Sequence, residues 1–325
     1  MAIGGYNQLP LTNLNTVLHA EAYCFQSARA ALYAYLNETK VKVIYLPNYI
    51  CDSIIPAIKS LHIQIEFYEI NAKLEPEINI NNLDKSNSKI LIINYFGLLD
   101  EKINKMTALE AELFIIDNSQ ALFCEHIEGT TSIYSPRKFL GIPDGGYLFT
   151  SKNIAMPTEY FDASKNSGHL LLRAAGFVQE GYTRFLEAEQ ALDSFAPKKM
   201  SVISEYIIKC TDIKSIKEKR RSNYKVLNNM FKSQNQLQVS LTQKVPLCYP
   251  LKLNFDVDNL CRELISNGIY LPRYWRSEYS GETGKNMFNK TLFLPVDERL
   301  RGCDMDTLID AIEQKISSDH SRCLR

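Results

Sequence analysis

The sequence predicts an α/β protein with a large, mostly parallel sheet domain over residues 1–200 and a smaller α+β domain over residues 201–325. Two observations lead to this prediction. Short apolar runs of strand length alternate with helical segments as far as Thr150, which is typical of parallel strands joined by crossover helices. Beyond Thr150 this alternation stops, and a long charged helical stretch leads into a second, shorter alternation.

The elements of the first domain follow an irregular, polar segment of about twenty residues. Helices are expected at residues 22–36, where alanines and leucines form an apolar stripe, and at 53–61 and 101–111. The run at 90–95 is almost continuously apolar, as expected of a strand covered on both faces. The expected strands of this domain span residues 41–46, 63–68, 90–95, 113–117, 132–134 and 147–150.

The second domain begins with the charged helix at residues 201–233, which links the two domains, after a helical stretch at 164–194 that ends before Pro197. A later helix at 258–267 is closed by Gly268, a common helix terminator. A last helix starts at Asp304 and ends at Ile316, and a polar tail is expected after it. Strands are expected at residues 250–255, at a run into Leu271, and at 291–294.

Composition excludes several classes of protein. The formal net charge is zero, so nothing in the charge favours a nucleic acid or a membrane surface as partner. The eight cysteines form no Cys-x-x-Cys pair, which indicates reduced thiols in a cytoplasmic protein. The five histidines have no ligand-like spacing, so no metal site is expected. No apolar run reaches the ~20 residues of a membrane helix, and the N-terminus does not have the pattern of a signal peptide.

The candidate catalytic residues are Lys138 and Asp117. Asp117 ends the apolar run at 113–117, and Lys138 follows the strand-like residues 132–134 in a polar turn. A lysine in a loop is usually a solvated surface residue. In α/β proteins, however, sites form at the carboxyl ends of strands. We therefore expect this carboxylate and this amine to converge at one edge of the sheet.

This pairing suits pyridoxal 5'-phosphate, which needs a lysine for a Schiff base, an acid at its ring nitrogen and an anion site for its phosphate. The helix start at residues 27–29 offers a hydroxyl, backbone amides and a guanidinium for the anion. The alternative is an ordinary N-cap serine and a surface arginine. Gln120 is a candidate partner for the ring hydroxyl, and Tyr49 or Tyr95 for stacking on the ring.

Short motifs along most of the chain match one known family. They are SARAAL at 27–32, YLPNY at 45–49, INYFG at 93–97, DNSQA at 117–121, KFLGIPDGG at 138–146, RRSNY at 220–224 and LPVD at 294–297. With these motifs the chain resembles the DegT/StrS family of pyridoxal-phosphate-dependent sugar aminotransferases. That resemblance implies fold type I, the aspartate-aminotransferase-like architecture, and the Asp117 and Lys138 motifs are its most specific parts.

The resemblance implies a transfer in two steps. An amino acid, commonly glutamate, gives its amino group to the cofactor, and a keto substrate, a nucleotide-linked keto-sugar of polysaccharide or sugar biosynthesis, then takes it. Lys138 holds the cofactor and moves the proton, and Asp117 keeps the ring nitrogen protonated. Ser27, Ala28, Arg29 and Ser135 bind the cofactor. The resemblance also implies a homodimer with sites near the subunit interface.

Three features depart from the family pattern. Ala28 stands where the family often has glycine. The residues before the lysine, YSPR at 134–137, differ from the usual Ser-aromatic-His, and Ser135 is the serine we assign to the phosphate. The chain is also shorter than expected of enzymes acting on sugar nucleotides. Arg273 and Trp275 are further candidates, from the second domain, to cover the substrate.

Three alternatives remain. A non-catalytic or regulatory binding protein would keep the fold and change its use, and a sugar dehydratase would keep the cofactor, although that chemistry usually accompanies loss of the lysine. The third is an oxidoreductase like the short-chain dehydrogenases, because residues 134–138 match Tyr-x-x-x-Lys. Such an enzyme needs a glycine-rich turn after its first strand, and this chain has no glycine between Gly5 and Gly97.

Overall fold

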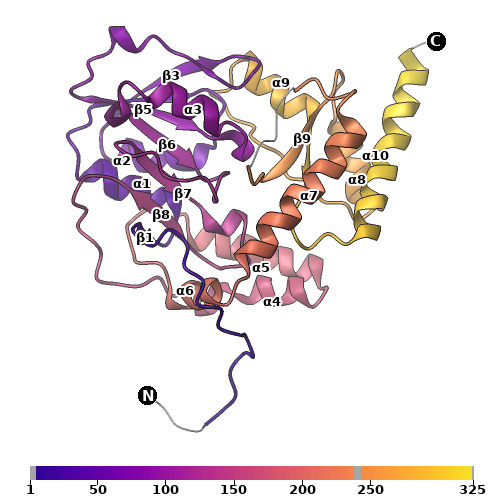
Figure 1. Ribbon diagram of the computed structural model, residues 1–325, viewed down its shortest axis with the longest axis horizontal. Coiled ribbons are helices and arrows are strands. Elements are labelled where there is room, and N and C mark those ends of the chain that lie inside the picture. Colours follow the sequence, from indigo (N-terminus) through magenta and orange to yellow (C-terminus); the bar gives the residue numbers. More distant parts are fainter. Residues whose placement is uncertain (1–4, 238–243, 324–325) are drawn as a thin grey trace.

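The computed structural model describes residues 5–237 and 244–323. Its larger sheet has eight strands in the order β1-β8-β7-β6-β5-β2-β3-β4 (Figure 1). Strands β7, β6, β5, β2 and β3 run parallel to one another, whereas β8, β1 and β4 are antiparallel to their neighbours. The predicted mostly parallel sheet is therefore confirmed. The strands are β1 (Tyr23–Phe25), β2 (Val43–Pro47), β3 (Gln64–Ile70), β4 (Pro76–Glu77), β5 (Ser88–Ile93), β6 (Phe114–Asn118), β7 (Thr131–Tyr134) and β8 (Gly146–Phe149).

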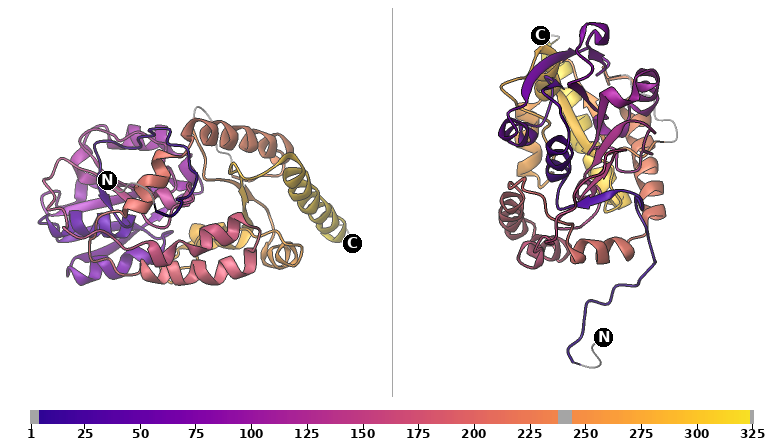
Figure 2. Two further views of the ribbon diagram at one scale, coloured as in Figure 1. Left: turned by 90° about the horizontal axis from the view of Figure 1, so that it is seen from below. Right: turned by 90° about the vertical axis from the view of Figure 1, so that its left-hand side faces the viewer.

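A second, smaller sheet pairs β9 (Cys248–Lys252) with β10 (Thr291–Pro295) in antiparallel register. It lies in the C-terminal part of the chain, beside the helices α7 to α10 (Figure 1). Figure 2 shows the long helix α7 running from the part that holds the large sheet toward α10. The domain boundary near residue 200 stays a prediction.

Ten α-helices are described. They are α1 (Ala28–Asn37), α2 (Ile55–Ser60), α3 (Asp100–Thr107), α4 (Gly168–Ala174), α5 (Val178–Ala191), α6 (Val202–Lys209), α7 (Ile213–Phe231), α8 (Asp258–Ser266), α9 (Glu282–Lys290) and α10 (Gly302–Cys323). Short 3-10 turns lie at η1 (Asp52–Ile54), η2 (Ile80–Asn82), η3 (Tyr95–Gly97), η4 (Ala111–Leu113), η5 (Pro136–Lys138) and η6 (Ser164–Asn166). None of the described helices is both long and apolar enough to cross a bilayer.

The central strands lie in the core, as their continuous apolar sequence predicts. In β5, residues 90–93 are at most 2 % exposed, and Phe114, Ile115 and Ile116 of β6 are at most 1 % exposed. Both faces of these strands are therefore covered. Helix α1 packs on β7 and β8 and on α2. Its buried face, Ala30, Ala31 and Leu32, allows this close approach because the side chains are small or flexible.

Two predicted helices are divided in the structure. The segment predicted as one helix at 22–36 contains strand β1, and α1 begins only after Ser27, which has extended backbone angles and caps the helix. The segment predicted at 201–233 breaks after α6, because the Asp212 carboxylate accepts the amide hydrogen of Ser215 at 3.0 Å and starts α7 anew. A side-chain cap of this kind satisfies a backbone amide that has no partner within the helix, and so marks a helix start.

Other expectations near the C-terminus need correction. No strand is formed at Leu271, since residues 269–280 have irregular backbone in the described chain. The last helix begins at Gly302 and continues to Cys323, so most of the predicted polar tail is helical. The predicted helical stretch at 164–194 consists of η6, α4 and α5 with turns between them.

Candidate functional site

The sheet register brings the two candidate catalytic residues to one edge. In the parallel strands β5, β6 and β7, Asp117 lies between Ile93 and Ile133 as its direct neighbours. Neighbouring strands lie about 5 Å apart. The chain leaves β7 after Tyr134 and enters η5, which ends at Lys138. The end of β6 with Asp117 and the turn with Lys138 therefore share the carboxyl edge of the sheet.

Lys138 projects from a turn whose backbone is held firmly. The amides of Lys138 and Leu140 donate to the carbonyls of Ser135 (3.3 Å) and Pro136 (2.9 Å). Arg137 Nε donates to the Pro143 carbonyl at 3.1 Å and closes the loop that follows. The Lys138 side chain itself is exposed, whereas Ser135 at the start of the turn is buried. An amine on a fixed backbone that faces solvent is accessible to a small molecule.

Asp117 is oriented by its own turn. Its Oδ1 accepts the amide hydrogen of Ser119 at 2.8 Å, and the residue is only partly buried. Gln120, one residue further, is almost fully buried. Its Oε1 accepts the amide hydrogen of Phe96 at 3.1 Å, whereas its Nε2 is buried without a partner among the described residues. A buried amide donor without an acceptor is costly, so Gln120 offers an unfilled donor to a ligand oxygen.

The start of α1 lies directly against the start of β8. The amide of Gly145 donates to the Gln26 carbonyl at 2.7 Å, and Gly145 forms a parallel bridge with Ser27. A Cβ on Gly146 would lie 2.1 Å from the carbonyl carbon of Ser27 and 2.4 Å from the nitrogen of Ala28. The predicted anion site at residues 27–29 is therefore joined by backbone contact to the loop that carries Lys138.

Ser27 and Ala28 lie at this helix start as predicted, but Arg29 points elsewhere. Ser27 Oγ accepts the amide hydrogen of Ala30 at 3.1 Å, an ordinary cap. The Arg29 guanidinium donates to the carbonyls of Leu192 (3.3 Å) and Asp193 (3.1 Å), just beyond the end of α5, and to the Asp193 carboxylate. A cation is favoured at a helix C-terminus, so in this structure Arg29 fixes α5 to α1.

Tyr49 and Tyr95, the two candidates for stacking, stack on each other. Their ring centroids are 5.3 Å apart with an interplanar angle of 21°. The Tyr95 hydroxyl donates to the Tyr49 carbonyl at 2.6 Å, and the Tyr49 hydroxyl donates to the Tyr274 carbonyl at 2.6 Å. Burial raises the pKa of both phenols well above the usual value, so both stay protonated.

The irregular segment at 269–280 completes this aromatic cluster. The ring centroid of Trp275 lies 5.3 Å from that of Tyr49 and 6.3 Å from that of Tyr95. Arg273, the other residue predicted from this segment, is held by the Asp258 carboxylate at 2.7 Å and donates to the Phe288 carbonyl. Trp275 therefore reaches the edge of the large sheet, whereas the Arg273 guanidinium is bound to α8 and α9.

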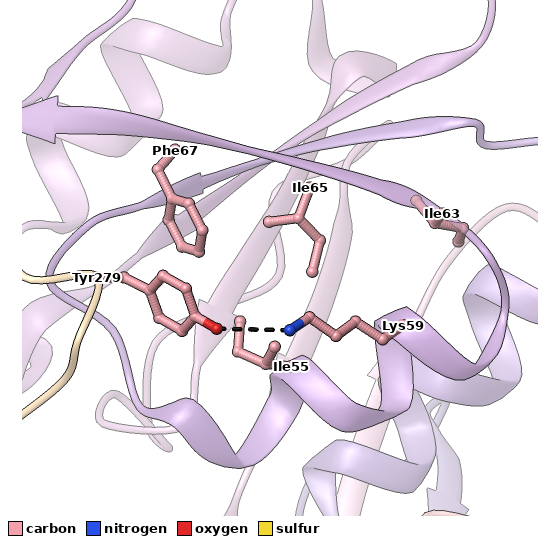
Figure 3. Close-up of a pocket in the computed structure, with 6 residues that line it drawn as sticks. All are labelled: Ile55, Lys59, Ile63, Ile65, Phe67 and Tyr279. Atoms are coloured by element: carbon pink, nitrogen blue, oxygen red, sulfur yellow. Dashed lines mark hydrogen bonds between the residues drawn. The ribbon is translucent and has the colours of Figure 1, made fainter.

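A separate hollow of about 250 Å³ lies between α2 and β3 (Figure 3). Phe67 and Tyr279 stack at 4.5 Å on one side, and Lys59 reaches the Tyr279 hydroxyl at 3.5 Å. Ile55, Ile63 and Ile65 supply the apolar lining. It contains none of the predicted site residues. Within residues 5–237 and 244–323, no group of three His, Cys, Asp or Glu residues is placed to hold a metal ion.

Asp144 and its partners were not predicted from the sequence. This carboxylate is completely buried, and it accepts hydrogen bonds from Ser201 and Ser204 at the start of α6. The Pro-Asp-Gly-Gly corner at 143–146 is visible in the sequence, but the serines that donate hydrogen bonds to Asp144 lie more than fifty residues further along the chain. A local signal exists at Ser201, a residue type that commonly caps a helix start.

The contact of Gly146 with Ser27 predicts a large effect of one methyl group. Gly146→Ala is expected to lower the free energy of unfolding by about 2 to 3 kcal/mol, because the new Cβ overlaps backbone atoms that cannot rotate away. Gly141→Ala is the matched control in the same loop, since a Cβ there meets nothing within 4 Å. Denaturant unfolding of both variants measures the difference, and equal effects would contradict the packing of α1 on β8.

The fold defined here is that of known aminotransferases. No protein-family model matches the sequence, and no curated protein matches it. The aminotransferase TlmJ from Streptoalloteichus hindustanus is similar over 92 % of this chain and 86 % of its own, with 14 % identity and a TM-score of 0.65.

Two further structures agree with this fold. A DegT DnrJ EryC1 StrS aminotransferase from Brucella abortus is 15 % identical over 93 % of this chain and 86 % of its own, with a TM-score of 0.61. PseC from Helicobacter pylori, an aminotransferase involved in the biosynthesis of pseudoaminic acid, is 14 % identical over 91 % of this chain and 87 % of its own, also at 0.61. These comparisons confirm the fold type I architecture that the motifs implied.

Proposed function

We propose that this protein is a pyridoxal-phosphate-dependent aminotransferase that moves an amino group from an amino acid, glutamate, to a nucleotide-linked keto-sugar. Two observations carry the proposal. Asp117 at the end of β6 and the turn that ends at Lys138 share one edge of the sheet, and a backbone bridge joins Ser27 to Gly145 in the loop after that turn. Support also comes from the solved structures. Spr1654 from Streptococcus pneumoniae, 13 % identical, has the same fold in its PLP form, and DesI, 12 % identical, was solved with its TDP-sugar product.

The described residues fit the cofactor. Gln120 Nε2, three residues after Asp117, is a buried donor without a partner among the described residues, which supports Gln120 as the partner of the ring hydroxyl. Gly146 allows β8 to approach the backbone of residues 27–28, and the first amides of α1 point outward from the helix there. The residue that this contact requires to be a glycine is Gly146 in β8, whereas Ala28 lies on the other side of the contact, at the start of α1. Ala28 is partly exposed.

Each residue then has a role. When bound, pyridoxal phosphate supplies a carbonyl for the amine and a ring that accepts electron density. The Lys138 amine binds the cofactor and afterwards carries a proton at its Nζ. The Asp117 carboxylate holds a proton on the ring nitrogen. Ser27, Ser135 and the α1 amides bind the phosphate. Tyr49 and Tyr95 are at most 2 % exposed, so they support the site from within the core.

A cluster of exposed apolar residues supports the homodimer. On α4, α5 and the turn between them, Leu171 (58 %), Phe177 (54 %), Tyr182 (60 %) and Leu186 (50 %) are exposed in the single chain. Such patches mark interaction surfaces, and α5 is tied to α1 through Arg29. We propose that a second copy covers this hairpin near the site, in a cytoplasmic enzyme with reduced thiols. Light scattering of the purified protein measures this state, and a monomer would contradict it.

One experiment separates the candidate functions. The purified protein is saturated with pyridoxal phosphate, and its visible absorption band is followed as glutamate is added. Loss of the band followed by its return on adding a keto-sugar nucleotide supports the aminotransferase. A band that no amino donor alters indicates the binding protein. Absence of any band contradicts the cofactor.

A further inference from the structure

Asp144 is a charged side chain in an unusual setting. Its exposed fraction is 0 %. Its Oδ1 accepts hydrogen bonds from the hydroxyls of Ser201 and Ser204, both at 2.5 Å, and its Oδ2 accepts the Ser201 amide at 2.8 Å. The Asp144 amide donates in turn to Ser204 Oγ at 3.3 Å. A buried carboxylate is tolerated only with such a set of donors.

These contacts link the loop after Lys138 to the start of α6. Ser201 is the N-cap of α6, and its Oγ accepts the amide of Ser204 while it donates to Asp144. The loop between Lys138 and Asp144 buries Phe139, Leu140 and Ile142. A shift of the carboxylate therefore moves a packed loop as a unit.

Asp144 also borders the start of α1. The next residue, Gly145, donates to the Gln26 carbonyl, and the buried Gln26 side chain bonds the Ala196 carbonyl and the Lys198 amide, each at 2.7 Å. The chain around residues 196–201 is thus fastened both to the segment before α1 and to the corner at Asp144. The segment at 196–201 therefore connects the candidate phosphate site at the start of α1 with the loop that follows Lys138.

We propose that Asp144 is a positioning residue that fixes the Lys138 turn relative to the start of α1, acting through Ser201 and Ser204. The proposal rests on the proposed function for the role of Lys138. A carboxylate that only caps α6 would stabilise the fold and leave the reactivity of Lys138 unchanged. A positioning carboxylate sets both the mobility of the 136–146 segment and the geometry of the Lys138 amine.

The test compares Asp144→Asn with Asp212→Asn. Both wild-type aspartates accept a backbone amide at a helix start, but Asp212 lies at α7. Two readouts are used: amide hydrogen exchange of residues 136–146 without cofactor, and trapping of pyridoxal phosphate on Lys138 by borohydride, quantified by peptide mass. We expect faster exchange and roughly 10- to 100-fold slower trapping in Asp144→Asn, with neither change in Asp212→Asn.

Each outcome decides a separate point. Wild-type exchange and trapping in folded Asp144→Asn, with only a lower melting temperature, would overturn the positioning role. If Asp144→Asn does not fold, Ser204→Ala removes one donor and is read in the same way. If wild-type Lys138 traps no cofactor, the proposed function fails. The exchange of residues 136–146 then still decides whether Asp144 fixes the turn.

Discussion

Replacing Lys138 with alanine is expected to abolish the visible absorption band of bound pyridoxal phosphate and to reduce transamination by at least about 10³-fold. The side chain supplies the only amine proposed to bind the cofactor covalently and to carry the proton. Because Lys138 is exposed and its backbone bonds remain, the free energy of unfolding should change by less than about 0.5 kcal/mol. Absorbance, steady-state rates and denaturant unfolding measure the three quantities.

The control for this variant is Lys152→Ala. Lys152 is also exposed and follows β8, which is antiparallel to β7, so it tests the loss of a surface amine at the opposite edge of the same sheet. We expect it to keep the absorption band and the rate. A Lys138→Ala protein that still turns over at the wild-type rate would remove this residue from the mechanism, and with it the proposed function.

The second large effect is expected for Asp117→Asn, with kcat lower by about 10²-fold or more and with the absorption band retained. The amide keeps the shape of the side chain, and its oxygen can still accept the Ser119 amide hydrogen that orients it. It carries no charge, however, and so does not hold a proton on a ring nitrogen. The KM for the amino donor should change little, because the lost interaction strengthens mainly during the reaction.

The control for this variant is Asp162→Asn at an exposed position, where the carboxylate accepts hydrogen bonds only within its own turn. We expect wild-type kinetics there. If Asp117→Asn shows wild-type kcat, the carboxylate does not face the cofactor ring. The site would then have to be built from other residues at this edge of the sheet.

Much of the fold could be predicted, because a strand that is buried on both faces of the sheet has a continuously apolar sequence. The runs at 90–93 and 113–116 are apolar throughout, and the structure places them in or next to β5 and β6 in the centre of the sheet. The break in the helix predicted at 201–233 was harder to predict, because it depends on one residue, Asp212, whose carboxylate accepts the Ser215 amide hydrogen and starts α7.

The sequence predicted which residues lie at the edge of the sheet, but it did not predict which side chains they contact. Asp117 and the Lys138 turn share a sheet edge because parallel strands all end on the same side. The partner of Arg29 was not predictable, since α5 follows more than a hundred residues later. The stacking of Tyr49 on Tyr95 was not predictable either, because it depends on the backbone conformation of η3, which follows β5.

The sequence by itself determined the strand runs, the position of Asp117 at the end of one and of Lys138 after another, and the family that the motifs resemble. These features are local, since they depend on the burial pattern and the chemistry of neighbouring residues. The tertiary structure alone decided that Gly146 lies on the backbone of Ser27 and that Asp144 is enclosed by Ser201 and Ser204. Such contacts join segments far apart in the chain, and only the packed fold brings their atoms within bonding distance.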